Sequence, residues 1–189
     1  MDDLRSRLGA AKTAYDTGNF EQAFGLYRAI AEAGNTEAQV FVAWMLTKGV
    51  GCQADEAEAE DFYERAAALG SAIGSFYHGR WLTRSGDHAG AYRMYLVGAR
   101  AKYVPSIFRV GHSLVRGKGV AQDLKKGYAF LTEAALRGHV FALREIAVQD
   151  WKGSRGVLGR AFSLLLFPVV VVYGLIIGLF DGHSDRFRA

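Results

Sequence analysis

Histidine, cysteine and serine are the side chains of this chain whose spacing could support catalysis or metal binding. The five histidines are His78, His88, His112, His139 and His183. They form no HExxH motif and no other ligand spacing, so a metal site would need distant turns to converge. Cys52 is the single cysteine, which excludes an internal disulfide, and no serine lies in a G-x-S-x-G context. The sequence therefore predicts a protein that is not an enzyme, with no metal and no cofactor.

A run of glycine and lysine at 117–127, GKGVAQDLKKG, could be mistaken for a phosphate-binding loop. A Walker loop needs Gly-Lys-Ser/Thr after a strand, and no strand is evident before this run. We expect instead that Gly117 and Gly119 are turn residues with positive φ between two helices.

Small residues recur along the chain with a helical-repeat period, and these repeats must position any functional side chain. Ala38, Gly74, Ser106 and Ala142 are separated by 36, 32 and 36 residues. Five residues after each of them stands another small residue: Ala43, Gly79, Gly111 and Ala147. These offsets mark one face of the first helix of each repeat.

The second helices carry a stripe of small, large and small residues. Its columns are Ala23, Ala59, Ala91 and Gly127, then Tyr27, Tyr63, Tyr95 and Leu131, then Ala31, Ala67, Ala99 and Ala135. Small residues let helix backbones approach closely, and the large ring fills the gap between layers. Helix ends are expected at Gly34, Gly70 and Gly138, with Lys102 as the exception. Because such units bury their apolar faces only by stacking, we expect one array over about 4–153.

Two stretches resemble Sel-one-like repeats, a subclass of the tetratricopeptide superfamily. They are AQVFVAWMLTKGVGCQADEAEAEDFYERAAALG at 38–70 and SIFRVGHSLVRGKGVAQDLKKGYAFLTEAALRG at 106–138. The second has Gly111, the Gly117-x-Gly119-Val120 loop and Asp123, whereas Ala43 and Cys52 replace the family's Gly and Val in the first. The units at 6–34 and 74–102 lack the insertion and look like shorter tetratricopeptide-type repeats. They turn at Gly18-Asn19 and Gly86-Asp87.

The resemblance implies an all-α solenoid of about four and a half helix pairs over residues 1–156. Related repeat proteins serve as scaffolds in cell-envelope assembly, polysaccharide export, signalling or degradation at membranes. The implied function is therefore non-enzymatic binding of a protein partner.

Aromatic and basic side chains of the first helices are the candidate partner-binding residues. They are Phe41, Trp44, Tyr77, Arg80, Trp81, Arg84, Phe108, Arg109 and His112. Large aromatic residues anchor partner segments, and arginines form charge-assisted hydrogen bonds around them. Packing between layers is the alternative role for part of this set.

Residues 161–180, AFSLLLFPVVVVYGLIIGLF, contain no charge. A helix of that length spans ~30 Å, and its side chains sum to about −4 to −8 kcal/mol on an insertion scale. We predict a transmembrane helix at 157–180 and a short tail at 181–189. Gly174, Gly178 and Gly182 recur every fourth residue, which favours close contact with another membrane helix. A core helix of a larger assembly is the alternative.

The charge of the chain changes sign along its length. Residues 1–73 carry 6 Lys/Arg and 12 Asp/Glu, and residues 74–160 carry 15 and 5. Lys152, Arg155 and Arg160 precede the apolar segment, so the positive-inside rule predicts a cytoplasmic amino-terminal domain. We expect the membrane to be a bacterial inner membrane. The basic half would face the anionic lipids of the cytoplasmic leaflet. Because no nucleic-acid-binding fold is recognised, we expect no nucleic-acid partner.

Two functions remain open from the sequence. The first is a single-pass, membrane-anchored scaffold that holds a protein in the groove of its repeats. The second is an accessory subunit that docks onto a membrane enzyme or transporter through its transmembrane helix. Self-association of the chain stays open in both cases.

Overall fold

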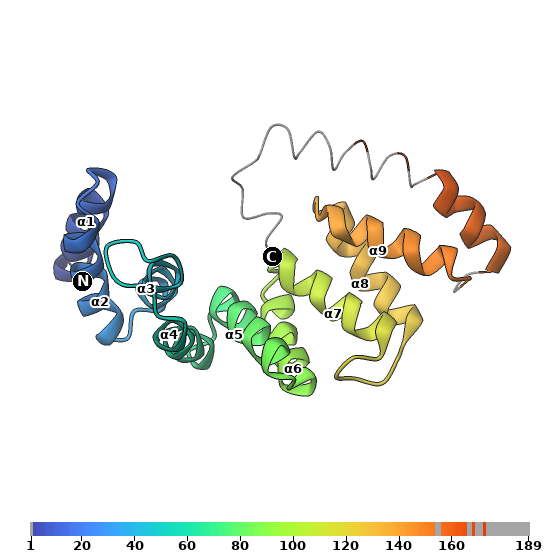
Figure 1. Cartoon of the computed structure of the whole chain (residues 1–189), viewed down its shortest axis with the longest axis horizontal. Helices are drawn as coiled ribbons and strands as arrows, with labels where there is room; N and C mark the ends of the chain where they lie inside the picture. Colours follow the sequence, from blue (N-terminus) through green and yellow to red (C-terminus); the bar gives the residue numbers. More distant parts are fainter. Residues whose placement is uncertain (1, 154–155, 166–167, 169–171, 173–189) are drawn as a thin grey trace. The chain divides into compact units, whose positions relative to one another are not determined.

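The computed structural model describes residues 2–153, 156–165, 168 and 172, and the described part of the chain is helical throughout (Figure 1). Two compact units divide the chain at Gly86 and Asp87. Unit 1 contains α1 (Asp2–Asp16), α2 (Phe20–Glu32), α3 (Thr36–Lys48), α4 (Glu56–Ala68) and α5 (Ala72–Ser85). Unit 2 contains α6 (His88–Arg100), α7 (Val104–Arg116), α8 (Leu124–Leu136) and α9 (Val140–Trp151), followed by helical residues 156–165.

Short polar caps and left-handed residues set the helix boundaries. Asp55 accepts hydrogen bonds from the backbone N–H groups of Ala57 and Glu58 at the start of α4, and Asp123 accepts one from Lys126 at the start of α8. Such caps satisfy backbone donors that the first turn leaves without partners.

The expected chain reversals are confirmed. Gly34, Gly70 and Gly138 have φ of 90°, 85° and 87°, and Gly18 and Gly86 have φ of 80° and 91°. Lys102, the predicted exception, adopts the same left-handed conformation with φ of 61°.

The long loops of the two Gly-x-Gly repeats share one conformation. Gly49 and Gly117 end α3 and α7 in the left-handed region, and Gly51 and Gly119 also have positive φ. A Cβ added to Gly51 would lie 2.1 Å from the carbonyl oxygen of Phe20, and one on Gly119 would lie 2.0 Å from that of His88. Each loop therefore packs directly on the first residue of the preceding second helix, which explains why glycine is needed there.

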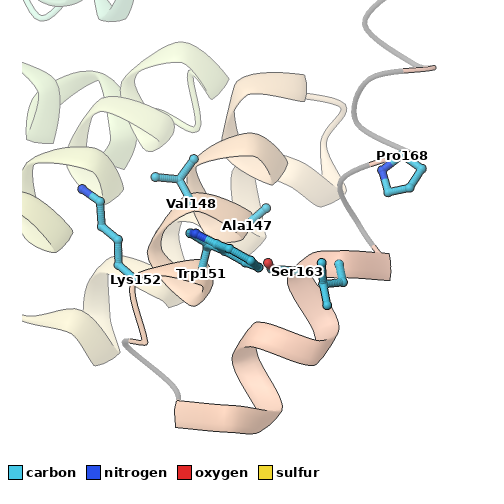
Figure 2. A pocket seen from close by; sticks show the side chains of 7 residues that line it. Ala147, Val148, Trp151, Lys152, Ser163 and Pro168 are labelled. Carbon is cyan, nitrogen blue, oxygen red and sulfur yellow. The ribbon is translucent and has the colours of Figure 1, made fainter.

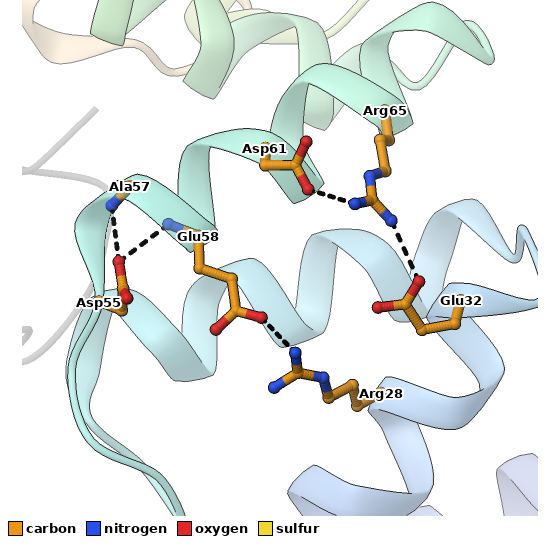
Figure 3. Close-up of polar contacts among 7 residues, drawn as sticks. All are labelled: Arg28, Glu32, Asp55, Ala57, Glu58, Asp61 and Arg65. Carbon is orange, nitrogen blue, oxygen red and sulfur yellow. Dashed lines mark hydrogen bonds and ion pairs between the residues drawn. The ribbon is translucent and has the colours of Figure 1, made fainter.

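Unit 1 is held together by contacts between consecutive helices from α1 to α5. Its core contains the small residues of the repeat columns, including Ala23, Ala38 and Ala59, with Phe62 and Tyr63 filling the space between helices. Ion pairs join the second helices α2 and α4 at two places (Figure 3). Arg28 lies 2.5 Å from Glu58, and Arg65 lies 3.1 Å from Glu32.

In unit 2, the predicted small residues form a close helix contact. Gly111 of α7 and Gly127 of α8 face each other, since a Cβ on Gly111 would lie 3.1 Å from the Gly127 carbonyl oxygen. Hydrogen bonds between side chains hold α9 against α8 and α7. Tyr128 donates a hydrogen bond of 2.7 Å to buried Asp150, and Arg116 donates two of 3.1 Å each to Glu145.

The predicted transmembrane helix at 157–180 lies largely outside the described residues, as do the tail at 181–189 and Gly174, Gly178 and Gly182. Within the described residues, no helix has both the length and the apolar character needed to cross a membrane. Residues 156–165 are helical, with buried Gly159 and Ser163 on one side.

Candidate functional site

A small pocket in unit 1 gathers three of the predicted binding residues. It has a volume of about 90 Å³, and we call it the tyrosine pocket. Its lining residues come from α3, α4 and α5: Thr47, Glu56, Ala59, Glu60, Tyr63, Tyr77, Arg80 and Arg84. Pockets for drug-sized ligands have volumes of about 300–1,000 Å³, so this one fits a single side chain of a partner better than a complete small molecule.

Two stacked rings line this pocket. Tyr63 of α4 and Tyr77 of α5 have ring centroids 4.6 Å apart with an angle of 17° between planes. Burial raises the pKa of Tyr63 well above its usual range, so the phenol stays neutral at physiological pH. The pair provides a rigid aromatic surface that the repeat register predicts, because Tyr63 belongs to the large column of the second helices.

Two arginines of α5 lie along the pocket in different settings. Arg84 is 3.6 Å from Glu56, and both side chains are exposed. The guanidinium of Arg80 lies over the rings of Tyr77 and Phe76, 5.6 and 5.9 Å from their centroids. Among the described residues, no carboxylate oxygen lies within 4.0 Å of Arg80. Arg80 thus offers its hydrogen-bond donors at the pocket while aromatic contacts hold it.

Glu60 and His78 form a pair at the same pocket that the sequence analysis did not select. The Nδ1 atom of His78 is in hydrogen-bond contact with Oε1 of Glu60, and both side chains are largely buried. Burial raises the pKa of Glu60, against the opposing effect of His78. The repeat register places each residue next to a small position, Ala59 or Gly79, but it does not connect the two residues with each other.

Trp81 lies next to this pair on α5. Its ring is nearly parallel to that of His78, at 10° and 6.4 Å between centroids, and 38% of the residue is exposed. Trp81 therefore presents a supported aromatic surface close to Arg80.

Phe41 and Trp44 of α3 belong to a separate aromatic cluster. Phe41 lies 4.5 Å from Tyr27, 5.3 Å from Tyr15 and 5.5 Å from Trp44 between ring centroids. Both residues are half-buried and pack against the Ala14, Ala23 and Met45 core. Their contacts are those of packing between α1, α2 and α3, the alternative role that the sequence left open.

The predicted residues of unit 2 lie on α7. Phe108 is only 8% exposed, and its ring stacks on His139 at 4.3 Å. Arg109 lies over the Phe108 ring at 5.9 Å, and His112 lies 5.8 Å from it. The structure thus places Phe108 in the packing between α7 and the start of α9. Packing is the alternative role that the sequence left open for part of this set, but His139 was not named as the partner, because the contact depends on the residue that caps α9.

Charged groups near His112 form a partly buried polar cluster, in which Glu145 is buried and Arg116 is 42% exposed. Burial lowers the pKa of His112, aided by neighbouring arginines. Burial alone would raise the pKa of Glu145, but hydrogen bonds from Arg116 and Gln149 outweigh it and hold that pKa below its usual value. This cluster joins α7 to α9 through the hydrogen bonds from Arg116 to Glu145.

In the described part of the chain, we find no candidate metal site, and Gly117 and Gly119 adopt the conformation expected of turn residues. No group of three or more His, Cys, Asp and Glu residues there could hold a metal ion. Gly117 and Gly119 have φ of 65° and 77°, as expected for turn residues, and the N–H of Lys118 donates to the Ser113 carbonyl oxygen.

The fold and the site define an all-α helical-repeat protein of the kind that binds other proteins. The sequence profile of the Sel1 repeat matches residues 7–35, 36–71 and 104–139, and the chain belongs to this family. The unit at 6–34, which looked like a shorter tetratricopeptide-type repeat, is therefore a Sel1 repeat. Sel1 repeats generally mediate protein–protein interaction. No curated protein matches the chain.

Solved structures show the same fold. A Sel1 repeat protein from Oxalobacter formigenes is 19% identical with a TM-score of 0.78, covering 89% of this chain and 68% of the other. A protective antigen of uropathogenic Escherichia coli strains with an SLR fold is 17% identical with a TM-score of 0.78, covering 96% and 42%. An immunity protein from Pseudomonas aeruginosa is 19% identical with a TM-score of 0.51, covering 75% and 59%. At these identities the likeness concerns the fold alone.

Proposed function

We propose that this chain is a non-enzymatic scaffold that binds a protein partner at the tyrosine pocket of unit 1. The main support for this proposal is the environment of the Arg80 side chain. Its guanidinium lies on the aromatic surface of the pocket and has no carboxylate within ion-pair distance among the described residues. A guanidinium held in this way pairs well with a carboxylate that arrives on a partner.

The neighbouring groups favour an acidic segment with an apolar residue beside it. Glu56 and Glu60 already contact Arg84 and His78, which reduces their repulsion of an incoming carboxylate. Trp81 follows Arg80 in the chain, is 38% exposed and stacks on His78, the hydrogen-bond partner of the lining residue Glu60. Tryptophan and arginine are the residue types that most often dominate binding energy at interfaces.

Photo-crosslinking in the native host tests this proposal. A photoreactive phenylalanine derivative replaces Trp81 in the full chain, and the captured protein is identified by mass spectrometry. We expect one dominant partner whose capture is lost in Arg80→Glu and retained in Arg7→Glu, an exposed charge reversal on α1 of the same unit. Equal capture in the Arg80→Glu and Arg7→Glu backgrounds would contradict the proposal.

We also propose that the chain is attached to a membrane through residues 157–180, with the repeats on the cytoplasmic side of a bacterial inner membrane. The helical residues 156–165 support this, because Leu158 is 85% exposed while Ser163 is only 4% exposed. A helix surrounded by water normally buries its large apolar residues instead. Lys152, Arg155 and Arg160 would then lie near anionic headgroups of the cytoplasmic leaflet.

Alkaline carbonate washing and a topology reporter test the membrane attachment. The intact chain should stay with the vesicle pellet, and a reporter fused before Met1 should be active only in the cytoplasm. Release of the chain by carbonate, or a reporter active on the far side, would overturn it. Cell-envelope or polysaccharide assembly is the pathway in which we propose to look for the partner first.

The exposed apolar residues of 156–165 also favour the second candidate, an accessory subunit of a membrane enzyme or transporter. Under this alternative, Gly174→Leu and Gly178→Leu abolish association with the partner complex, whereas Trp44→Ala and Trp81→Ala leave it intact. The scaffold proposal expects the larger loss from the Trp81→Ala change.

A further inference from the structure

A large apolar pocket in unit 2 lies between α9 and the helical residues that follow it (Figure 2). We call it the α9 pocket. Its volume is about 460 Å³, and its lining residues are Ala147, Val148, Trp151, Lys152, Ser163, Leu164 and Pro168. Trp151 lies against Ser163 in Figure 2, with Pro168 across the pocket from α9 and Lys152 directed away from Pro168. This volume lies within the range of sites that hold small organic molecules.

The chemistry of the lining favours an apolar occupant. Alanine, valine, leucine, proline and the tryptophan ring form most of the wall, and Ser163 adds one small hydroxyl. Water in contact with such a wall finds few hydrogen-bond partners, because Ser163 supplies the hydroxyl and most of the other lining side chains are apolar. Hydrocarbon therefore fits this pocket better than water does.

The surroundings of the α9 pocket are also apolar and exposed. Val157, Leu158 and Leu165 of the following helix are exposed, and the lining residues Trp151 and Leu164 are also 60% and 61% exposed. The chain then continues as the uncharged segment up to residue 180. A contiguous apolar surface of this kind marks contact with a membrane or a partner.

One cationic side chain lines the same pocket, and a second lies against the residue that follows it in the chain. Lys152 lines the pocket, and the guanidinium of Arg160 lies against Gly153, where an added Cβ would be 3.1 Å from an Arg160 nitrogen. Among the described residues, neither cation has a carboxylate oxygen within 4.0 Å. An anionic group can therefore bind at this end of the pocket without displacing an existing ion pair.

We propose that the α9 pocket holds an acyl chain of an anionic membrane lipid, with the lipid's phosphate near Lys152 and Arg160. This inference rests on the proposed membrane attachment and adds a specific lipid site to it. An acyl chain matches the apolar wall, and the negative headgroup matches the two cations. A bound lipid would hold α9, the last repeat helix, at the membrane surface.

Quenching of tryptophan emission by brominated lipid tests the site. The full chain with Trp44→Phe and Trp81→Phe keeps Trp151 as its single tryptophan. It is reconstituted into lipid nanodiscs that contain phosphatidylglycerol with either brominated or ordinary acyl chains. We expect brominated phosphatidylglycerol to remove most of the Trp151 emission, and brominated phosphatidylcholine to remove less.

Filling the pocket distinguishes a bound lipid from simple contact with the bilayer. Ser163→Leu adds a side chain inside the pocket, and Ala161→Leu adds the same side chain at an exposed position of the same helix. Emission should recover in Ser163→Leu and stay quenched in Ala161→Leu. Circular dichroism checks that the variants are folded, and Ala147→Leu fills the pocket from α9 as a second variant.

Three outcomes would be decisive. Equal quenching in the filled and control variants would overturn the lipid site and leave the membrane attachment standing. An unquenched parent chain within the discs would also overturn the site, and would indicate a protein helix or residues 173–189 as the occupant. Failure of the chain to enter the discs would count against the proposed membrane attachment itself.

Discussion

The imidazole of His139 stacks on the ring of Phe108 with 4.3 Å between centroids and 19° between planes. His139 precedes α9, is 9% exposed, and its two ring nitrogens have no hydrogen-bond partner among the described residues. Burial, together with the charge of Arg109, lowers the pKa of His139 to about 4. The contact between α7 and α9 therefore depends on a neutral histidine.

Acidification should destabilise unit 2 through His139. The unfolded chain, with a histidine pKa near 6.5, binds a proton before the folded chain does as pH falls. The stability that neutral His139 contributes is thus complete above about pH 6.5 and is lost progressively as the pH falls towards 4, by about 3 kcal/mol. Urea denaturation at pH 7 and pH 4.5 measures this loss. His139→Gln should lose less stability than the parent over the same interval, and an equal loss would contradict the assignment.

Substitution of Gly51 should reveal the contact between loop and helix. Gly51→Ala places a Cβ 2.1 Å from the Phe20 carbonyl oxygen at a φ of +69°, so we expect a loss of about 2–4 kcal/mol. Gly18→Ala is the matched control, because it has a φ of +80° and nothing within 4 Å of the new Cβ. Its expected cost is about 1 kcal/mol. Equal changes in thermal unfolding of the two variants would contradict the close approach.

The bidentate pair between Arg116 and Glu145 should contribute more to stability than the surface ion pairs. Arg116→Ala leaves the carboxylate of Glu145, which is 8% exposed, without its strongest partner. We expect a loss of about 1–3 kcal/mol. Arg137→Ala removes an exposed pair with Glu133 on one helix and should cost less than about 0.5 kcal/mol. Chemical denaturation compares the two variants, and equal costs would show that burial adds nothing to the pair.

The repeat architecture was predictable from the sequence because residue size is a local property. Only small residues fit where helix backbones approach, so the columns containing Gly111 and Gly127 identified the close contact between α7 and α8. The turn conformations of Gly117, Gly119 and Lys102 followed from the same register.

The side-chain partners were less predictable because they depend on rotamers across neighbouring helices. Tyr77, Arg80 and Arg84 do line one pocket, but Phe108 was selected for the groove and packs on His139 instead. The Glu60–His78 pair joins residues of different helices that no motif connects. The predicted transmembrane helix and its glycines lie largely outside the described residues and stay a prediction.

Affinity for the captured partner tests the scaffold account most directly. Titration calorimetry or biolayer interferometry compares the full chain with Arg80→Ala, Arg7→Ala and a chain truncated after residue 156. We predict at least a tenfold loss of affinity in Arg80→Ala, equivalent to about 1.4 kcal/mol, with Arg7→Ala and the truncated chain binding as the parent does. Unchanged binding by Arg80→Ala together with loss of binding on truncation would contradict the account.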